Sequence, residues 1–250
     1  EGEAHCHPLN YALGIAQAAL SAGAKIYENT AASGYKVLDD HVKVITKNGS
    51  VKADRIVLAC NGYLGNLEKS LTSKILPMNN YIVATKPLSD EVVKKINPRD
   101  IAFADSRFVI NYFRMSADKR LLFGGGENYS QELSKNIVPI VTKPLEKIYP
   151  FLKGVKIDYA WGGKLAITLN RLPFFTTLKN DRVISAQGYS GQGVALASYS
   201  GKIISEKILG SGETFDLMAK IPRQSFPGGR FLRNPSMKIG MLYYSLLDRI

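Results

Sequence analysis

The sequence predicts a mixed α/β fold with a largely antiparallel sheet in its middle. Two observations lead to this class. Early in the chain, a segment with helical periodicity is followed by short β-type segments and by an unbroken apolar run at residues 55–60, which is typical of a strand buried on both faces. From residue 76 to residue 124, three β-type segments follow one another, and a polar turn at 116–119 predicts a hairpin between the last two, which favours antiparallel pairing. The predicted class is therefore α/β (α+β).

The first quarter of the chain predicts one helix and several strands. Apolar residues recur at near-helical spacing up to Leu20, and Gly23 has the position of a glycine that ends a helix. Asn48-Gly49 is the strongest short hairpin signal. The predicted elements are a helix over 10–22 and strands over 25–27, 42–47 and 55–60, the last ending in Asn61-Gly62. This order is typical of the second half of a dinucleotide-binding α/β domain.

The remaining pattern predicts further strands and helices. A polar turn at 116–119 predicts a hairpin between two strands. Pro144 is expected to break or kink the helix that contains it. The predicted strands cover 76–84, 107–113, 120–124, 157–161 and 183–186, and the predicted helices cover 138–149, 194–208 and, after a loop at 222–233, residues 237–250.

Composition excludes several classes of protein. The 250 residues are 45% hydrophobic and 22% charged, which excludes a disordered, collagen-like or disulfide-scaffold chain. The longest apolar runs, such as 56–60, fall far short of the roughly 20 residues of a membrane-spanning helix. Two cysteines without a C-x-x-C pattern favour a reducing cytoplasm and argue against a zinc site. The net charge of +12 would attract nucleic acid, anionic lipid or a phosphate-bearing cofactor and does not choose among them.

The start of the chain is unusual. It reads EGEAHCHPLN, with no initiator Met, no basic n-region and no apolar signal core. We expect the interior of a longer protein, that is, a fragment or a truncated gene product; a mature N-terminus after processing is the alternative.

A glycine-rich loop, residues 188–193, is the sharpest local signal for a ligand. Its sequence GYSGQG precedes a predicted helix, and glycines let a backbone approach a flat or anionic ligand beside the unsatisfied N–H groups of a helix N-terminus. A phosphate or a reduced flavin would fit there; a tight strand-to-helix turn without a ligand is the alternative. The loop is not a P-loop, because no Gly-Lys-Ser/Thr follows, and it misses the hydrolase pattern G-x-S-x-G by one position.

Other polar motifs are less specific. The segment Asn111-Tyr112-Phe113-Arg114 combines a phenol and a guanidinium on a strand, as anion-binding or substrate-lining walls do; an ordinary strand with one exposed face is the alternative. His5 and His7 flank Cys6 without a further cluster at metal-ligand spacing, so no metal is expected. Basic residues are scattered rather than interleaved with aromatic residues, so no nucleic acid is expected as a partner. Binding to a membrane surface through the basic tail is a weaker alternative.

Several segments together resemble one family. In chain order they are HCHPLNYALGIAQAA, GAKIYENTAA, ADRIVLACNGYLG, NYIVATKPL, FRMSADKRLLFGGGENY, DYAWGGKLAITLNRLPFF and GYSGQGVALASYSGKIISE. This series resembles the flavin-dependent amine and amino-acid oxidases of the D-amino-acid oxidase and glycine oxidase class, and most of all the bacterial γ-glutamylputrescine oxidase branch. It matches only the C-terminal part of such enzymes; their opening βαβ unit with the G-x-G-x-x-G loop is not among these residues.

The resemblance implies a partial FAD-binding, Rossmann-like domain and a mostly antiparallel substrate domain. The implied divisions are 1–71, the second part of the FAD-binding domain; 72–168, the substrate domain; and 169–250, the return to the FAD-binding domain and the tail. It implies FAD as cofactor and oxidation of the C–N bond of an amine, a γ-glutamyl-polyamine or an amino acid by hydride transfer to flavin. The isolated chain is expected to be inactive. The alternative is a flavin-free interaction subunit that pairs with a separate N-terminal chain.

The same resemblance implies which residues lie at the cofactor. Ala31 and Ala32 would face the adenine, and the turn Ala59-Cys60-Asn61-Gly62 would cover the cofactor. Backbone N–H groups of the glycine-rich segment would face the pyrimidine edge of the isoalloxazine, where negative charge develops on reduction. That segment consists of Gly188, Tyr189, Ser190, Gly191, Gln192, Gly193 and Val194.

Four residues are implied at the substrate. Tyr112 corresponds to the substrate-wall tyrosine of the family, and Glu127 would face the substrate over the flavin. The arginine that holds the substrate carboxylate in glycine and D-amino-acid oxidases is replaced by Leu165, with Lys164 beside it. A free α-amino acid would thus lose its main anchor, and an ionised Glu127 would favour a cationic amine. A Glu127 carboxylate turned toward solvent is the alternative.

Overall fold

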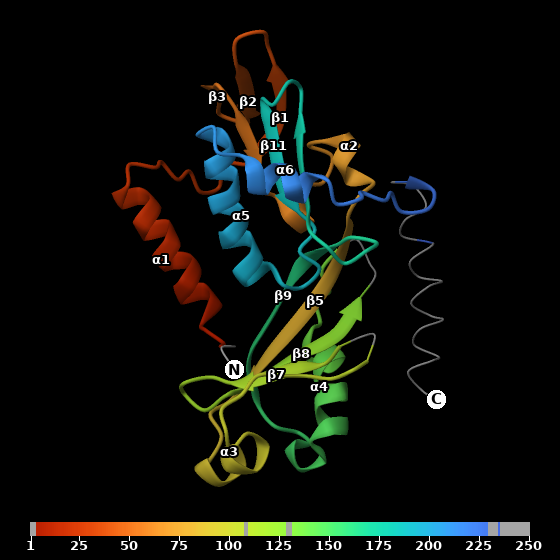
Figure 1. Ribbon diagram of the computed structural model, residues 1–250. Helices are drawn as coiled ribbons and strands as arrows, with labels where there is room; N and C mark the ends of the chain where they lie inside the picture. Colours follow the sequence, from red (N-terminus) through yellow and green to blue (C-terminus); the bar gives the residue numbers. More distant parts are fainter. Residues whose placement is uncertain (1–3, 108–109, 129–131, 230–234, 236–250) are drawn as a thin grey trace. The chain divides into compact units, whose positions relative to one another are not determined.

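The structure is a computed structural model that describes residues 4–107, 110–128, 132–229 and 235 (Figure 1). The chain divides into two compact units, named here unit 1 and unit 2. The described residues of unit 1 fall within 4–11 and 78–164, with residue 235, and those of unit 2 within 12–77 and 165–229. The helix expected at 237–250 lies outside the described residues. Within the described ranges, no helix has the length and apolarity that a membrane crossing requires.

Helix α1, Pro8–Ser21, confirms the first predicted helix. None of its side chains is buried, and the apolar Leu9, Leu13 and Ile15 are 60%, 58% and 45% exposed. The chain leaves the helix at Gly23, whose φ of 91° lies in the left-handed region that glycine adopts without strain. The helix is therefore specified by its local sequence rather than by burial.

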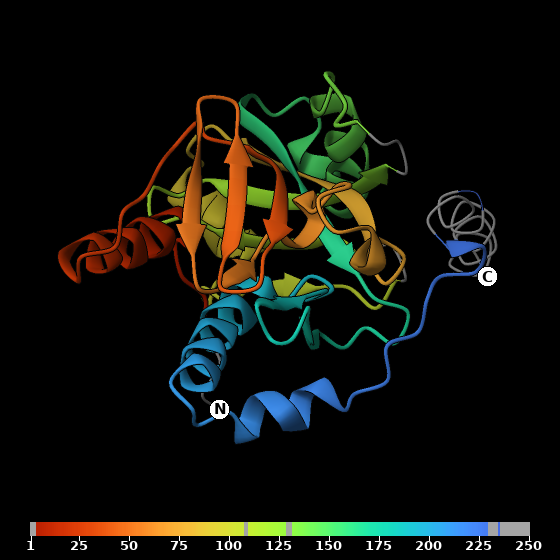
Figure 2. The same cartoon turned by 90° about the horizontal axis from the view of Figure 1, so that it is seen from above.

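A three-stranded antiparallel ribbon follows α1 in unit 2. Strand β1, Ala32–Val37, pairs with β2, Val42–Thr46, which pairs with β3, Gly49–Ala53 (Figure 2). Thr46 lies opposite Gly49, so the hairpin predicted at Asn48-Gly49 is confirmed.

The strand expected at 25–27 is wrong. These residues adopt no regular structure, and Ile26 and Tyr27 are 49% and 67% exposed. A strand needs a neighbour for its N–H and C=O groups, and in none of the described sheets does a strand pair with this segment. Apolar residues with high strand propensity therefore remain irregular here.

The second sheet of unit 2 contains a parallel pair. Its order is β10–β11–β4, with β10 at Phe174–Leu178, β11 at Val183–Gln187 and β4 at Ile56–Leu58. β10 and β11 are antiparallel, whereas β4 is parallel to β11. The strands predicted at 55–60 and 183–186 are confirmed. The expected burial of the first on both faces is wrong, because β4 is an edge strand and its Val57 is 39% exposed.

Helices pack against this second sheet. Helix α5, Gly193–Ile208, directly follows the glycine-rich loop, as predicted. Its Ile203 and Ile204 share a core with Phe175 of β10. Helix α6, Glu213–Ala219, is not predicted by the sequence pattern and contributes Phe215 to the same core. The short turns that follow β4 are η1, Asn61–Tyr63, and α2, Lys69–Thr72.

Unit 1 is built on a five-stranded sheet of order β6–β7–β8–β5–β9. The four strands from β6 to β5 pair antiparallel with their neighbours, which confirms the pairing predicted for the middle of the chain. The strands are β5, Leu76–Thr85; β6, Phe103–Ala104; β7, Tyr112–Met115; β8, Leu121–Asn128; and β9, Ile157–Ile167.

Strand β7 starts later than the strand expected at 107–113. The Asp105 carboxylate accepts hydrogen bonds from the backbone N–H groups of Arg107, at 3.3 Å, and Asn111, at 2.9 Å. These bonds take the N–H groups away from strand pairing, so regular pairing with β8 begins at Tyr112. The turn at 116–119 then joins β7 to β8, as predicted.

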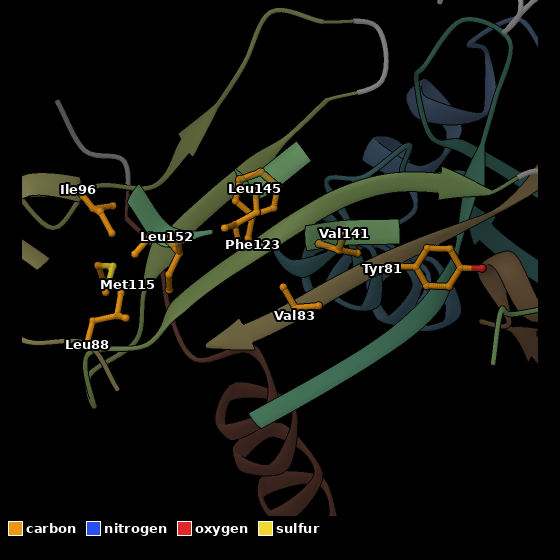
Figure 3. Close-up of a cluster of buried hydrophobic side chains, with 10 residues drawn as sticks. Tyr81, Val83, Leu88, Ile96, Met115, Phe123, Val141, Leu145 and Leu152 are labelled. Carbon is orange, nitrogen blue, oxygen red and sulfur yellow. The ribbon is translucent and has the colours of Figure 1, made fainter. Parts of the chain in front are cut away.

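One face of the five-stranded sheet holds the core of unit 1 (Figure 3). It packs against α4, Val138–Ile148, with α3, Asp90–Ile96, and the turn η2, Pro150–Leu152. The core residues are Tyr81, Val83, Leu88, Ile96, Met115, Leu121, Phe123, Val141, Leu145 and Leu152. Because successive side chains of a strand point to opposite faces, a second set of residues lies on the other face. This outer face, as we call it, includes Asn80, Ile82, Tyr112, Arg114 and Gly124.

Of the break or kink expected at Pro144, the break does not occur. The helix continues past it as one element to Ile148. Val141 and Leu145, on either side of Pro144, are both 0% exposed. Their packing outweighs the cost of a proline in a helix interior, which is about 3 kcal/mol.

The burial of Leu145 predicts a large effect on stability. Leu145→Ala should lower the free energy of unfolding by about 2–5 kcal/mol, because it removes buried methyl groups and leaves a cavity. Val138→Ala, on the same helix at a side chain that is 38% exposed, should cost about 0.5 kcal/mol or less. Urea unfolding followed by circular dichroism measures both variants. Equal losses would contradict this packing.

Candidate functional site

The glycine-rich loop lies at the carboxyl end of the parallel pair β4 and β11. The turn Ala59-Cys60-Asn61-Gly62 follows β4, and the loop Gly188–Gly193 follows β11 and leads into α5. Parallel strands place their carboxyl ends at the same edge of a sheet, so the turn and the loop are neighbours. This is the edge at which open α/β sheets bind ligands.

Asn61 and Gly188 connect the turn and the loop directly. The backbone N–H of Gly188 donates to Asn61 Oδ1 at 3.1 Å. The φ angles are 45° for Asn61 and 80° for Gly188, in the region that Asn and Gly adopt most readily. A Cβ at Gly188 would also lie 2.4 Å from Thr168 Cγ2, so the position requires glycine.

Ser190 fixes the centre of the loop to the end of β9. Its N–H donates to the Ala166 carbonyl at 3.0 Å, and its hydroxyl oxygen accepts from the Thr168 N–H at 3.3 Å. The Ser190 hydroxyl also donates to the Gly188 carbonyl at 3.2 Å. These bonds hold the loop backbone in one shape.

The start of α5 is open to solvent beside this fixed loop. Gly191, Gln192 and Val194 are exposed, and Gly193 is half-buried. The first N–H groups of a helix lack partners within the helix and carry partial positive charge, so they can donate to an anionic group. Tyr189, in contrast, is buried and donates its hydroxyl to a carbonyl of β11 at 3.1 Å; burial raises the pKa of this phenol, which keeps it a neutral donor.

Gln187, the last residue of β11, is a site residue that sequence analysis misses. Its side chain is 0% exposed, and among the described residues neither Nε2 nor Oε1 has a hydrogen-bond partner. Burying an amide without partners costs free energy, so the group indicates a partner that the described residues do not supply. The available signal is an amide at the end of a mostly apolar strand, directly before the glycine-rich loop.

The other expected cofactor residues occupy two places. Ala59 is exposed directly after β4, and Cys60 is half-buried; burial raises the pKa of the Cys60 thiol, which therefore stays protonated. Ala31 and Ala32 are exposed at the start of β1. They belong to the ribbon, which is a different sheet from the one that carries the turn and the loop.

A groove runs along β4 and α5. Its volume is about 610 Å³, and its lining includes Val57, Ala59, Ala186, Val194, Ile204 and Ile208. The small residues Gly193, Ala197 and Gly201 follow one another at every fourth position of α5 and also line it. A Cβ at Gly201 would meet no described atom within 4 Å. The groove is therefore a mostly apolar surface beside an edge strand.

Tyr112 lies on the outer face of the sheet in unit 1, against a glycine. The pairing of β7 with β8 places it opposite Gly124, and a Cβ at Gly124 would lie 2.1 Å from Tyr112 Cζ. The Tyr112 hydroxyl donates to Asn80 Oδ1 on β5. Asn80 is a second residue that sequence analysis misses, although the pair Asn79-Asn80 inside an apolar strand is a usable signal. The Tyr112 ring thus lies over Gly124, and its hydroxyl is bound to the Asn80 amide oxygen.

The remaining expected substrate residues belong to the same sheet. Glu127 is part of β8, next to the strand of Tyr112; its side chain is outside the described part of the structure. Lys164 and Leu165 are half-buried neighbours on the edge strand β9. Side chains alternate along a strand, so these two point to opposite faces.

The fold and the loop define a class of protein. Residues 1–207 match the family of FAD dependent oxidoreductases, so the chain belongs to this family. It is 38% identical, over 98% of its length, to gamma-glutamylputrescine oxidoreductase of Escherichia coli, and 39% identical, over 99%, to probable oxidoreductase OrdL of Rhizobium meliloti. It spans 58% and 57% of the length of these relatives. The resemblance drawn from the seven sequence segments is thereby confirmed.

Solved structures share the fold. Glycine oxidase from Geobacillus kaustophilus aligns with 85% of this chain and 57% of its own, with a TM-score of 0.68 and 20% identity. L-proline dehydrogenase from P. horikoshii aligns with 86% of this chain and 57% of its own, with a TM-score of 0.66 and 22% identity. These likenesses confirm the predicted fold class, in which an α/β part carries a mostly antiparallel second sheet.

The bond between Asn61 and Gly188 predicts the effect of a substitution. Asn61→Ala should lower the free energy of unfolding by about 1–3 kcal/mol, because alanine removes the acceptor and is strained at positive φ. Asn61→Asp keeps an acceptor oxygen and tolerates this φ, so it should cost less. Hydrogen–deuterium exchange of the Gly188 amide should become faster in the alanine variant alone. Exchange that is unchanged in both variants would refute this bond.

Proposed function

We propose that the protein to which this chain belongs oxidises the C–N bond of an amine or amino acid, with FAD as cofactor. The observation that supports this most is the fixed loop Gly188–Gly193 at the carboxyl end of a parallel strand pair, in a chain of the FAD dependent oxidoreductase family. FAD held at this sheet edge would supply the acceptor for a hydride from the carbon next to the amine nitrogen. The imine that remains is hydrolysed by water.

The residues at this sheet edge fit a flavin. The turn Ala59-Cys60-Asn61-Gly62 and the loop residues 188–194 offer mainly backbone, which a flat ring can approach closely. The N–H groups at the start of α5 would stabilise the negative charge of a reduced ring. Gln187 adds an amide whose donor and acceptor are both unused within the described residues. We keep Ala31 and Ala32 as adenine contacts on the resemblance alone.

We assign unit 2 to the cofactor and unit 1 to the substrate. Unit 2 carries the turn and the loop, and the outer face of unit 1 carries Tyr112. The expected divisions at 71/72 and 168/169 remain our proposal for the two domains; the compact units change at 77/78 and 164/165.

The proposed substrate is a cationic amine, with a γ-glutamylated polyamine as the first candidate. Leu165 occupies the place of the carboxylate-binding arginine of related amino-acid oxidases, so the usual anchor of an α-amino acid is missing. We propose that the Glu127 carboxylate instead compensates an ammonium group of the substrate. The name of the relative from Escherichia coli, gamma-glutamylputrescine oxidoreductase, supports this choice.

We also propose the cytoplasm as the compartment. Cys6 is exposed, Cys60 is half-buried, and both are free thiols. Free thiols persist in a reducing compartment.

The complete protein tests the proposed function. Purified with FAD, it should retain flavin absorbance after desalting, and γ-glutamylputrescine should bleach that absorbance without oxygen. Glu127→Gln should lower kcat/KM for this substrate by about 10- to 100-fold, because a neutral amide does not compensate an ammonium group, and should leave the flavin content unchanged.

The outcomes separate the parts of this proposal. A complete protein that holds no flavin would contradict the oxidoreductase function and favour the flavin-free interaction subunit. If the Glu127→Gln variant holds flavin and oxidises amines as well as the unchanged protein does, Glu127 has no part in substrate binding and the function stays intact.

We further propose that the groove beside β4 receives a segment of the protein outside these 250 residues. Val57 of β4 and Val194 and Ile208 of α5 are 39%, 54% and 37% exposed. An edge strand with exposed apolar neighbours is a place where another strand can pair. The matched relatives contain the additional length, since the chain spans less than three fifths of each.

Gly201→Trp tests the occupant of the groove. The indole would fill the open space beside α5, so the complete protein should lose flavin and melt several degrees lower. Ala195→Trp adds the same side chain to an exposed position of α5 that does not line the groove, and it should have little effect. If both variants behave like the unchanged protein, the groove holds no other segment.

A further inference from the structure

Arg114 is a half-buried cation on the outer face of the sheet in unit 1. Its strand neighbours pack into the core on the other face, where Met115 is buried and Phe113 stacks on Phe123 with ring centroids 5.4 Å apart. Because side chains alternate along a strand, Arg114 shares the outer face with Tyr112.

The partners of the Arg114 guanidinium are neutral. Nη2 donates to the Cys6 carbonyl at 3.0 Å, and Nη1 donates to the Met115 carbonyl at 3.2 Å. The residue opposite Arg114 on β8 is Leu122, whose partner on β5 is Ala84. The guanidinium therefore donates to two carbonyls, and the row of the sheet to which Arg114 belongs continues with two apolar residues.

Two other arginines of this unit, Arg107 and Arg120, are paired with carboxylates. Arg107 lies 3.7 Å from an Asp105 oxygen, and Arg120 lies 2.6 Å from oxygens of both Asp118 and Asp158. Within the described residues, Arg114 has no carboxylate within 4.0 Å. The strongest interaction of a guanidinium is a bidentate bond to a carboxylate. Because the two carbonyls that accept from Arg114 are neutral, this bond remains available to a ligand.

Tyr112 lies on the same face of β7, with its Cα about 7 Å along the strand from that of Arg114. Its ring lies over Gly124 of β8, and its hydroxyl donates to Asn80 Oδ1 on β5. The outer face thus carries a phenol and a guanidinium on side chains two positions apart in one strand.

We propose that Arg114 binds the carboxylate of the substrate and so selects amines that carry an anionic group at a distance from the oxidised nitrogen. The proposal rests on the function proposed above and names the feature of the substrate that this residue recognises. A γ-glutamyl amine has such a carboxylate on the γ-glutamyl group, whereas a plain diamine has none. Arg114, on β7, then binds a carboxylate in place of the arginine of related amino-acid oxidases, whose position on β9 is occupied by Leu165.

The test compares two substrates that differ in the carboxylate alone. γ-Glutamylputrescine and γ-aminobutyrylputrescine have the same length and the same amines, and the second lacks the carboxylate. In the complete protein, Arg114→Met should lower kcat/KM for the first about 10- to 100-fold, as expected for the loss of a charge-assisted bond, and should leave the second unchanged. Arg114→Lys should retain part of the preference, because a lysine keeps the charge without the bidentate geometry. Arg107→Met is the matched control and should change neither value.

Calorimetric titration of the same protein with both compounds provides a readout that needs no turnover. Binding of the γ-glutamyl compound should weaken by the same factor in Arg114→Met and not in Arg107→Met. Equal losses for both compounds, or an unchanged protein that does not distinguish them, would overturn the assignment of Arg114. Arg114-dependent binding without oxidation would overturn the proposed function and leave the carboxylate site in place.

Discussion

The parallel pairing of β4 with β11 is the interaction on which the candidate cofactor site depends. It joins residues 127 positions apart, such as Ile56 and Val183, and brings the ends of both strands to one edge. The Ser185 hydroxyl reinforces the pair by donating to the Leu58 carbonyl at 3.1 Å. Arg182, just before β11, donates to three carbonyls at one end of the ribbon, those of Asp39, Asp40 and Asp54. This long-range pairing aligns the two strands, and the alignment lets the Gly188 N–H donate to Asn61 Oδ1.

In unit 1, the alternation of side chains along each strand separates the core residues from the residues proposed to contact the substrate. Odd positions of β7, such as Phe113 and Met115, build the core with α4, while the even positions Tyr112 and Arg114 are left for the outer face. Gly124 lies on the outer face, where the absence of a side chain gives the Tyr112 ring its place. Substitutions on the outer face can therefore leave the core of the sheet intact.

The sequence predicts the structure correctly where interactions between neighbouring residues determine it. The hairpin at Asn48-Gly49 and the loop before α5 depend on glycine and asparagine at positive φ, which neighbouring residues reveal. Long-range contacts decided the rest. Within the described sheets, residues 25–27 have no pairing strand. The buried neighbours of Pro144 keep its helix continuous, and the hydrogen bond between Tyr112 and Asn80 joins residues 32 positions apart. The sequence shows an amide at position 187, but tertiary packing determines that it is buried. The sequence therefore does not reveal that Nε2 and Oε1 have no hydrogen-bond partner among the described residues.

The exposed side of α1 affects how the chain behaves in solution. Leu9, Leu13 and Ile15 present apolar side chains to water along a helix without a single buried residue. Water disfavours such a surface, and contact between two of these helices would remove it. A preparation of these 250 residues should therefore associate with itself as its concentration rises, against the repulsion of a net charge of +12, and salt that screens the charge should promote the association.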